Sequence, residues 1–374
     1  MPSWLKEGRG SLCGANVSLL LREMGITKPL LVAGERTKNV FFARTGMRLP
    51  VFDAFHPNPD LQDCVAGAAL YQEKGCDGLI SIGGGSAMDT AKGIKALLMT
   101  DIAHVRANQL PSEGNVPHLA IPGTAGTGAE TTAVAVLYEN GQKLSVDHPA
   151  LLPDGVLLDG SLLDTLPEYH RKSCAMDALA QGIESWWAKK ATPDSRIHAE
   201  RAIRGVLDNL TAYLQGDRKA QDEMLHAAYE SGVAILTTRT TAAHAMSYQI
   251  TKKLGAAHGH ACMLTLPHLW AHLAAQAEYQ PMLTELSRIL GGEKAMDGAI
   301  LLKGLLAVLE LDKIPMPDDA TLDMLAASVN PERLGNHPEA LTTAQLRAIY
   351  VQAFTPMTDT ERAEAIAAWE QYGK

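Results

Sequence analysis

The sequence predicts two domains, an α/β domain followed by an all-helical domain. Short apolar runs alternate with amphipathic helical segments over the first 165 or so residues, which is the pattern of βαβ units around a parallel sheet. From about residue 168, Ala- and Leu-rich helical periodicity continues almost to the last residue. A chain of 374 residues is long enough for both. We therefore expect the α/β domain over residues 1–166 and the helical domain over residues 167–374.

Each element of the first domain has its own local pattern. Apolar, β-prone runs predict four strands, at residues 29–34, 77–83, 118–122 and 154–159. Helical periodicity predicts helices between them, at residues 61–75 and 86–99. In the second domain, the Pro-containing segments 314–323 and 329–342 are expected to be loops between helices.

Charge and composition exclude some classes of partner. The 33 Lys and Arg residues against 42 Asp and Glu give a net charge of −9, and no basic run interleaves with aromatic residues, so no nucleic acid is expected as a partner. No leader-like or membrane-spanning apolar stretch occurs, which predicts a cytoplasmic protein with no membrane partner. The cysteines are five in number and lack CxxC spacing, and we expect them to be reduced and mostly structural: Cys13, Cys64, Cys76, Cys174 and Cys262.

Four residues of the second half have the types and spacing of metal ligands. Asp177 and Gln181 lie four residues apart in the helical segment CAMDALAQGIESWW, so they share one helix face. His244 and His258 would be roughly 21 Å apart on a continuous helix, which is too far for one metal with bonds of about 2.0–2.2 Å. The chain must therefore turn back between them, and Gly255 is the expected break. We expect three or four of these side chains to bind one divalent metal.

Two glycine-rich turns follow predicted strands in the first half. Gly83, Gly84, Gly85 and Ser86 precede a helix that carries Asp89 and Lys92, and such a helix start can bind an anion through its free N–H groups. The segment IPGTAGTGAETT forms a similar turn, with Gly123, Thr124 and Thr127. Either turn alone could be a purely structural strand-to-helix connection. Two of them at successive strand ends indicate a nucleotide cofactor, although neither has the G-x-G-x-x-G spacing.

The motifs GGGSAMDTAK, IPGTAGTGAE, DALAQGIES and AAHAMSYQI…AAHGH, in this order, resemble those of the iron-containing (group III) alcohol dehydrogenases. The resemblance implies the dehydroquinate synthase-like fold of that family, in which a nucleotide-binding α/β domain is followed by a helical metal domain. It also implies NAD(P)H as cofactor, a homodimer, and a divalent metal, with Fe²⁺ as the expected ion and Zn²⁺ or Mn²⁺ as alternatives.

The resemblance implies roles for individual residues. Asp177, His244 and His258 match three of the family's four metal ligands, whereas Gln181 stands where the fourth is usually a histidine and is either a weaker ligand or a hydrogen-bonding residue. Tyr248 occupies the position of a histidine that many members carry, and because tyrosine is a poor base at neutral pH, proton transfer falls to Tyr248, His260, solvent or a cofactor ribose. The expected cofactor-binding residues are Gly34, Gly83, Gly84, Gly85, Ser86, Asp89, Thr124, Thr127 and Lys143.

The segment TTRTTAAHAMSY indicates the kind of carbonyl substrate. Arg239 and Thr240 would bring a guanidinium and a hydroxyl close to the metal, and arginine binds oxyanions through paired hydrogen bonds. Together with His148 they are the expected substrate-binding residues, although Arg239 could instead form a structural ion pair. The motifs are also similar to those of the phosphonoacetaldehyde reductase subgroup, which implies a small anionic aldehyde as substrate.

Several alternatives stay open at this point. Sulfoacetaldehyde carries another tetrahedral oxyanion, and a general primary alcohol dehydrogenase would need no anion site. The sugar-phosphate cyclases, which are lyases, share the two-domain layout, and the departures at Gln181 and Tyr248 would also suit a non-catalytic binding protein. NADPH is an alternative to NADH, because Gly34 removes an acidic residue and Arg36 or Lys38 could contact a 2′-phosphate.

Overall fold

The computed structural model describes residues 6–112 and 116–372. The chain divides into two compact units, Met1–Thr165 and Leu166–Lys374, so the division falls one residue before the predicted boundary. None of the described helices combines the length and the apolarity needed to cross a membrane.

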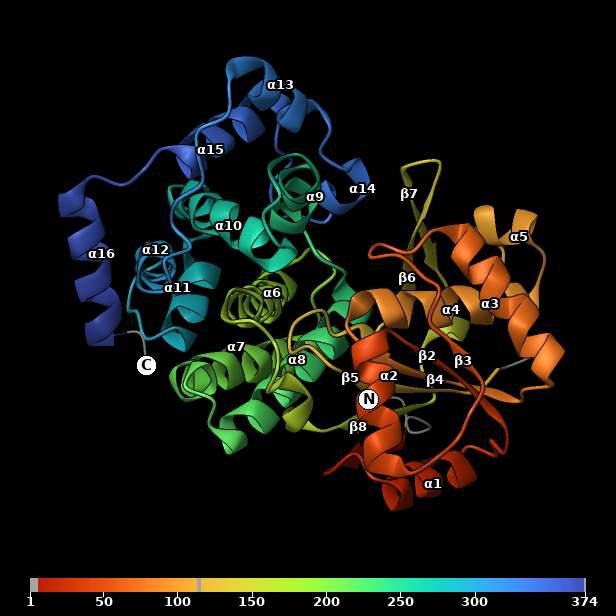
Figure 1. Cartoon of the computed structure of the whole chain (residues 1–374). Coiled ribbons are helices and arrows are strands. Elements are labelled where there is room, and N and C mark those ends of the chain that lie inside the picture. The colour runs from red at the N-terminus through yellow and green to blue at the C-terminus, as the bar shows by residue number, and fades with distance from the viewer. Residues whose placement is uncertain (1–5, 113–115, 373–374) are drawn as a thin grey trace. The chain divides into compact units, whose positions relative to one another are not determined.

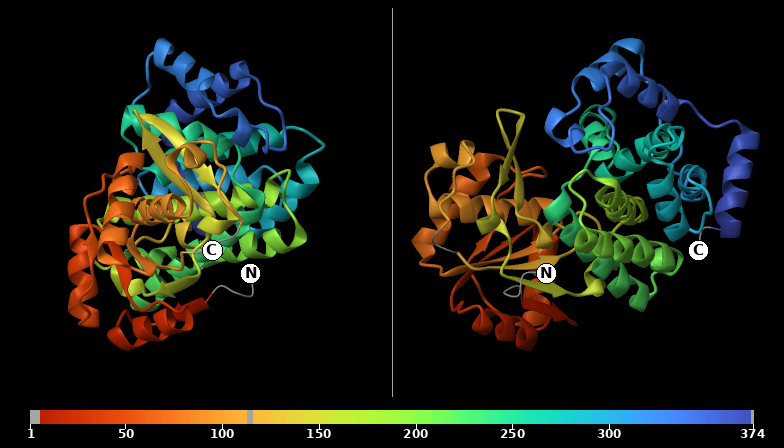
Figure 2. Two further views of the ribbon diagram at one scale, coloured as in Figure 1. Left: turned by 90° about the vertical axis from the view of Figure 1, so that its right-hand side faces the viewer. Right: turned by 180° about the vertical axis from the view of Figure 1, so that it is seen from behind.

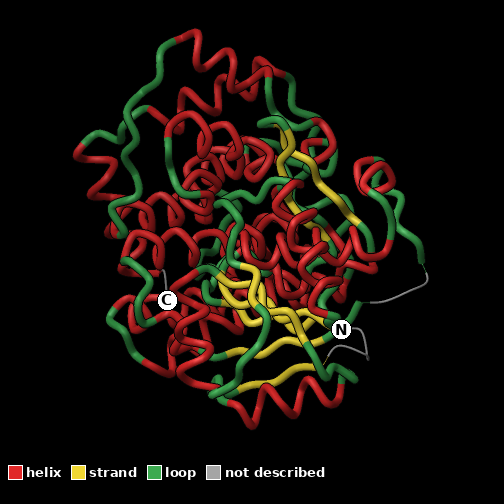
Figure 3. The backbone as a smooth tube through the Cα atoms, turned by 45° about the vertical axis from the view of Figure 1, so that its right-hand side comes forward, coloured by secondary structure: helices red, strands yellow, loops and turns green. Residues whose placement is uncertain are grey.

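The first unit contains a six-stranded, fully parallel sheet with the strand order β1-β8-β5-β4-β2-β3. Figure 3 shows strands in yellow among helices in red. The four predicted strands are present, and the sheet gains a short strand at each edge. Its members are β1 (Lys6–Arg9), β2 (Pro29–Ala33), β3 (Val51–Phe52), β4 (Gly78–Gly83), β5 (His118–Pro122) and β8 (Gly155–Leu158). Fully buried strands such as β2 and β4 read as continuous apolar runs because both faces of the sheet are covered.

Neighbouring residues of β2 enter two different cores. Leu30 and Val32 belong to a core shared with α3 and α4, whereas Leu31 and Ala33 belong to a core shared with α1 and α2. The period of two along a strand therefore places one helix pair on each face. The helices of this unit are α1 (Gly14–Glu23), α2 (Glu35–Thr45), α3 (Leu61–Lys74), α4 (Gly85–Met99) and α5 (Ile102–Arg106). A separate antiparallel hairpin, β6 (Val134–Glu139) with β7 (Gln142–Asp147), projects from the unit and packs on α4 through β6 (Figure 2).

The described part of the second unit is helical throughout. Helix α6 lies at its centre and packs against α7, α8 and α10 (Figure 1). The helices are α6 (Glu168–Trp187), α7 (Pro193–Leu214), α8 (Arg218–Thr238), α9 (Ala242–Leu254), α10 (His258–Ala274), α11 (Gln280–Ile289), α12 (Asp297–Val308), α13 (Asp319–Ala327), α14 (Pro331–Leu334), α15 (Thr343–Phe354) and α16 (Asp359–Tyr372).

Two segments predicted as loops are partly helical, and that prediction was wrong in both places. Helix α13 begins inside residues 314–323, where the Asp318 side chain accepts a hydrogen bond from the Thr321 amide. The short α14 lies inside residues 329–342, with Asn330 as its N-cap and Pro331 as its first residue. Asp, Asn and Pro mark helix starts as readily as turns, so composition alone could not decide between them.

Candidate metal centre and cofactor turns

Helix α6 carries three polar side chains into the interior of the second unit. Asp177, Gln181 and Glu184 are 3%, 4% and 0% exposed. Their spacing of four and three residues places them along one face of the helix. Because a buried carboxylate is costly unless it is paired or bound to a cation, the groups that meet this face define the site.

The chain turns back between His244 and His258, as the sequence predicts. Helix α9 ends at Gly255, whose φ of 75° is the left-handed conformation that glycine adopts without strain. Helix α10 then begins at His258, and the two imidazole rings lie with their centroids 5.2 Å apart. Gly259 allows the start of α10 to pack closely on α6, since a Cβ on it would stand 2.0 Å from the Ser173 carbonyl oxygen of α6.

Four donor atoms from three helices meet at this place. The Oδ1 atom of Asp177 is 3.2 Å from His244 Nε2 and 3.9 Å from His258 Nε2, and Cys262 Sγ is 4.0 Å from His258 Nε2. One donor atom from each of the four residues lies within 4.8 Å of the others. Bonds of about 2.0–2.3 Å hold tetrahedral donors roughly 3–4 Å apart, so small side-chain adjustments would let these residues hold one ion.

The centre is closed on one side and open on the other. The side chains of Asp177 and His244 are 4% and 5% exposed, whereas the His258 side chain is 38% exposed. A structural metal site is closed on all sides, while a catalytic one keeps a position for substrate or water. The exposed flank of His258 therefore fits a catalytic site.

Glu184 holds His244 in place, a role that the sequence analysis did not assign. Its Oε2 atom accepts a hydrogen bond from His244 Nδ1, and its Oε1 atom accepts from the Thr241 hydroxyl at 2.6 Å and the Ala243 amide at 2.9 Å. Ser247 contacts His258 Nδ1 in the same way, at 3.2 Å. Both rings thus turn Nε2 towards Asp177, as in the carboxylate–histidine–metal arrangement. The available signal was the position of Glu184 seven residues after Asp177 on one helix face.

Cys262 belongs to this donor group, whereas the sequence indicated cysteines that are mostly structural. It is fully buried and lies one helical turn after His258 on α10. The i, i+4 spacing of His258 and Cys262 was visible in the sequence but was not used. The other four cysteines are free thiols that do not belong to the donor group.

Gln181 forms hydrogen bonds with both ends of its amide, as the hydrogen-bonding alternative to a ligand role would require. Its Nε2 atom donates to Asp177 Oδ1 at 3.4 Å, and its Oε1 atom accepts from the Ser231 hydroxyl at 2.8 Å. A carboxylate can only accept, so the amide N–H end faces Asp177 and the amide oxygen faces Ser231.

The titratable groups of the centre stabilise one another's charge. Burial alone would raise the pKa of Asp177, but His258 and His244 hold it below its usual value. Burial likewise opposes ionisation of Cys262, yet the two imidazoles lower the pKa of its thiol to about 7. The centre thus favours the charged forms of Asp177 and Cys262, and a divalent cation bound there would favour them as well.

The two residues considered for proton transfer differ in their surroundings. The Tyr248 ring stacks on His258, with a centroid distance of 6.0 Å and an interplanar angle of 7°. Both nitrogens of His260 are engaged elsewhere, Nδ1 with the Tyr169 hydroxyl at 3.1 Å and Nε2 with the Leu311 carbonyl at 2.8 Å. These two hydrogen bonds hold the start of α10, and the proton-relay role of His260 stays a prediction.

Arg239 has a backbone conformation that is rare for any residue other than glycine. Its φ of 63° and ψ of 177° fall in a region that costs an ordinary residue about 1–3 kcal/mol. The Asn336 side chain holds the strained segment by donating to the carbonyls of Thr238, at 2.7 Å, and Thr240, at 3.1 Å. The guanidinium donates to the Leu236 carbonyl at 2.8 Å. Arg239 and the buried Thr240 thus lead directly into the helix that carries His244.

The two glycine turns of the first unit lie side by side at the carboxyl ends of β4 and β5. Gly83 pairs with Pro122 in the sheet, and the Gly123 amide donates to the Gly83 carbonyl at 2.7 Å. A Cβ on Gly123 would lie 3.2 Å from Gly83 Cα, so any other residue there would push the two turns apart by a few tenths of an ångström. Helix α4 begins after Gly84 without a side-chain cap, which leaves its first amides available for an anion.

Residues around these turns have well-defined partners. Ser86 Oγ accepts from the Asn58 amide at 3.3 Å, and Thr127 Oγ1 accepts from the Ala129 amide at 3.3 Å. The Thr124 methyl group lies beside Gly84, and burial raises the pKa of Asp89 to about 6 despite the cations of Lys92 and Lys143. The fully buried Lys92 connects α4 to the second turn. Its Nζ atom donates hydrogen bonds to the carbonyl oxygens of Ala129 and Val134 and to the hydroxyl of Thr132.

The residues relevant to the cofactor's 2′ position lie at the start of α2. Gly34 is the N-cap of this helix, and a Cβ on it would meet nothing within 4 Å. Lys38 pairs with Asp53 at 2.5 Å and Arg36 donates to Thr165 Oγ1, so both cations already have partners. His148 also belongs to the first unit, where its Nδ1 accepts from the Ala150 amide at 3.2 Å.

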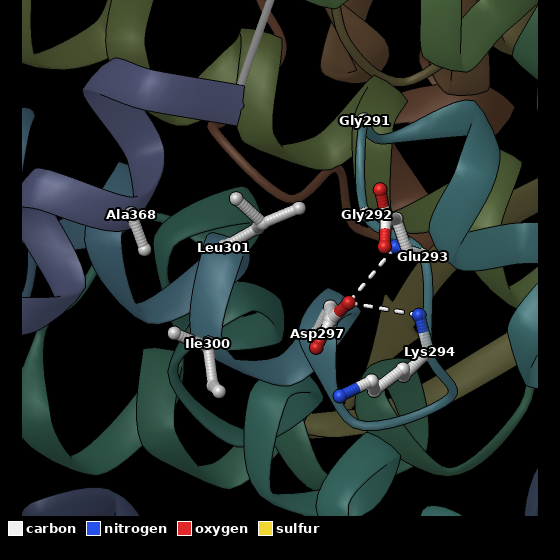
Figure 4. A pocket seen from close by; sticks show the side chains of 8 residues that line it. All are labelled: Gly291, Gly292, Glu293, Lys294, Asp297, Ile300, Leu301 and Ala368. Carbon is white, nitrogen blue, oxygen red and sulfur yellow. Dashed lines mark hydrogen bonds between the residues drawn. The ribbon is translucent and has the colours of Figure 1, made fainter.

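A pocket of about 270 Å³ in the second unit is separate from the metal centre (Figure 4). It lies between the turn before α12 and residue Ala368 of α16. Asp297 and Glu293 are the acidic residues among those that line the pocket. The Oδ2 atom of Asp297 accepts hydrogen bonds from the backbone amides of Glu293 and Lys294, at 2.8 Å each. The Asp297 carboxylate is therefore used to hold the turn.

Both halves of the chain match family models. Residues 3–160 match "Iron-containing alcohol dehydrogenase", and residues 172–354 match "Fe-containing alcohol dehydrogenase family, C-terminal". The NAD-dependent methanol dehydrogenase of Bacillus methanolicus is 30% identical over 299 residues, which are 75% of this chain and 77% of that protein.

Two further relatives bear on the substrate. The phosphonoacetaldehyde reductase of Streptomyces viridochromogenes is 36% identical over 228 residues, which are 57% of this chain and 58% of that protein. The matched region is thus less than two thirds of the length of that reductase. The same is true of the probable alcohol dehydrogenase EutG of Escherichia coli, of which 60% is matched. The sulfoacetaldehyde reductase of Bifidobacterium kashiwanohense, solved in complex with NAD⁺, superposes with a TM-score of 0.85 at 26% identity, covering 95% of this chain and 97% of that one.

Proposed function

Because the chain belongs to the iron-containing alcohol dehydrogenase family and is an oxidoreductase of the alcohol dehydrogenase and aldehyde reductase type, we propose that it reduces a small anionic aldehyde with NAD(P)H. This membership decides against the sugar-phosphate cyclase and the non-catalytic alternatives. Phosphonoacetaldehyde, reduced to 2-hydroxyethylphosphonate, is the proposed substrate, and sulfoacetaldehyde is its nearest competitor. Two relatives support this choice, since each is named as the reductase of an aldehyde that carries a tetrahedral oxyanion.

The strained backbone of Arg239 carries the proposal. A conformation that glycine would adopt freely is held here by an arginine, and Asn336 fixes the carbonyls on both sides of it. Strain of this kind persists where the surrounding structure maintains it and is concentrated at binding and catalytic sites. The segment continues into Thr241 and then His244, so the guanidinium is a suitable group to bind a phosphonate as substrate enters.

The residues of the metal centre have separable tasks. Asp177, His244, His258 and Cys262 would hold the ion, and Glu184 keeps His244 in the tautomer that presents Nε2. A bound divalent ion supplies Lewis acidity for the carbonyl, and the nicotinamide supplies the hydride. Reduction also needs one proton for the alkoxide, and Tyr248, stacked on the exposed flank of His258, is the proposed donor.

The cofactor is proposed to bind at the paired glycine turns. The uncapped start of α4 would receive the pyrophosphate, with Gly83, Gly84 and Gly85 allowing close approach. NADH is favoured over NADPH, because Lys38 and Arg36 are already paired and would have to leave their partners to bind a 2′-phosphate. Ratios of kcat/KM for the two cofactors test this choice.

The substrate proposal is tested by comparing Arg239→Gly, Arg239→Lys and the unmodified enzyme on phosphonoacetaldehyde, sulfoacetaldehyde and propanal. Arg239→Gly relieves the backbone strain while removing the guanidinium, so a folding defect is not expected to confuse the result. We expect KM for both anionic aldehydes to rise about 100-fold, from the loss of roughly 3 kcal/mol of charge-assisted hydrogen bonding, with propanal unaffected. Lys253, exposed at the end of α9, provides the matched control in Lys253→Ala. Equal losses on propanal and the anionic aldehydes would show that Arg239 binds no anion and would favour a general alcohol dehydrogenase.

A further inference from the structure

We propose that Cys262 is a direct thiolate ligand and that the centre is consequently a zinc site rather than an iron site. Cys262 here takes the place of the missing histidine, while Gln181 stays outside the coordination sphere and orients Asp177. The inference concerns the metal of the centre to which the proposed function is assigned.

The position of the thiol is the first argument. Cys262 and His258 project from consecutive turns of α10, and the sulfur lies 4.0 Å from His258 Nε2. Asp177 reaches the same point from α6 and His244 from α9, which makes all four donors mutually close. Because Gly259 has no side chain, α10 can pack directly against the backbone of α6, which places Cys262 and His258 close to Asp177.

The surroundings of Cys262 differ from those of an ordinary buried cysteine. Cys64 is an example of the latter, because it lies in an apolar core with Leu61 and Ile94 and its thiol faces the Thr90 carbonyl. A buried cysteine usually behaves as a small hydrophobic residue. The Cys262 sulfur instead faces two imidazoles and belongs to a group with a carboxylate, which are the neighbours of a ligand rather than of a packing residue.

The contacts of Gln181 explain how the centre manages without a fourth histidine. Its oxygen is bound by Ser231, and its N–H group donates to the ligand atom of Asp177. A residue that hydrogen-bonds a ligating carboxylate orients it without coordinating the ion. Gln181 can therefore occupy the position of a ligand while Cys262 supplies the donor.

Charge and softness determine which ion fits. Asp177 and a Cys262 thiolate contribute two negative charges, which neutralise a divalent cation in a site where three of the four ligands are buried. Thiolate with imidazole in a four-donor group favours Zn²⁺, whereas harder oxygen-rich sets favour Mg²⁺ or Mn²⁺.

The test uses the full-length protein after removal of metal with a chelator, and it needs no substrate. We would measure competitive loading with equimolar Zn²⁺ and anaerobic Fe²⁺ by elemental analysis, and record the near-ultraviolet spectrum of the Co²⁺ form, in which a cobalt–thiolate bond gives a charge-transfer band. We expect one ion per chain, at least tenfold preference for Zn²⁺, and a thiolate band. Cys262→Ser should lose the band and at least tenfold in Zn²⁺ affinity, whereas Cys174→Ser, on the same helix as Asp177 but outside the donor group, should retain both.

The remaining variant distinguishes the two candidates for the fourth ligand. Gln181→Ala should keep the thiolate band with a modest loss of affinity, and circular dichroism of each metal-free variant would show that it is folded. A band that persists in Cys262→Ser, preferential Fe²⁺ loading, or loss of metal in Gln181→Ala with no effect of Cys262→Ser would each overturn the assignment. Failure of the substrate proposal would leave these spectra unchanged, so the two proposals fail independently.

Discussion

The buried Glu184 carboxylate accepts a hydrogen bond from Nδ1 of His244, and this contact directs Nε2 of the ring at Asp177. The same carboxylate binds the amides that begin α9, so one side chain both caps a helix and orients a metal ligand. His244 is thus positioned from α6, the helix that also supplies Asp177.

Replacing Glu184 should weaken metal binding without removing a ligand. In Glu184→Gln the amide can still accept from Thr241, but it no longer carries the charge that stabilises the ring. We expect metal affinity to fall about 10–100-fold, measured by competition with a chromophoric chelator. Glu200, partly exposed on α7 and paired with Arg204, provides the matched control in Glu200→Gln. Unchanged affinity in Glu184→Gln would mean that the contact does not orient the ligand.

Adding one methyl group at Gly259 should disrupt the centre. A Cβ there would lie 2.0 Å from the Ser173 carbonyl oxygen and 2.6 Å from the Asp177 amide, and neither backbone atom can move freely. We expect Gly259→Ala to displace α10 from α6, to lose about 3 kcal/mol of unfolding free energy through overpacking, and to retain no metal. Thermal unfolding and elemental analysis measure the two effects. A variant with normal metal content would contradict the described approach of the helices.

Tyr248 and His260 should respond differently to substitution. Tyr248→Phe removes the proposed proton donor, and we expect kcat to fall about 10²-fold with unchanged metal content. His260→Gln breaks two interior hydrogen bonds and should lower stability by about 1–3 kcal/mol while kcat of the folded enzyme changes little. A large loss of kcat in His260→Gln with unchanged stability would instead identify His260 as the proton relay.

The parts that the sequence predicted well depend on local patterns. The strands before both glycine turns and the break at Gly255 follow from apolar runs and glycine, which act within a few residues. Cys262, Glu184 and Asn336 were missed because their importance depends on contacts across 60 or more residues, such as Glu184 with His244 and Asn336 with Thr238, or on a donor cluster formed by three helices. The roles of Gln181 and His260 were open for the same reason, since residue type does not disclose which neighbour occupies an amide or an imidazole.

Glu130, buried beside the second glycine turn, should make the stability of the first unit depend on pH. It is 1% exposed and one of its carboxyl oxygens has no hydrogen-bond partner among the described residues. Burial raises its pKa to about 7, against the opposing effects of its own backbone amide and of Lys92. In the unfolded chain the carboxyl loses its proton near its ordinary value of 4.5. Between pH 4.5 and 7 the folded state therefore binds more protons, and stability falls as pH rises.

Glu130→Gln should remove this dependence. The stability gained by the variant should be small near pH 5 and reach about 2–3 kcal/mol at pH 8, where ionised Glu130 bears the full cost of burial, because one pKa unit corresponds to about 1.4 kcal/mol. Urea unfolding at both pH values measures the difference. Glu139, which is partly exposed and paired with Arg106, provides the control, because Glu139→Gln should show no such gain at pH 8. A difference between Glu130→Gln and the unmodified protein that is the same at pH 5 and pH 8 would mean that Glu130 ionises as readily inside the fold as in the unfolded chain.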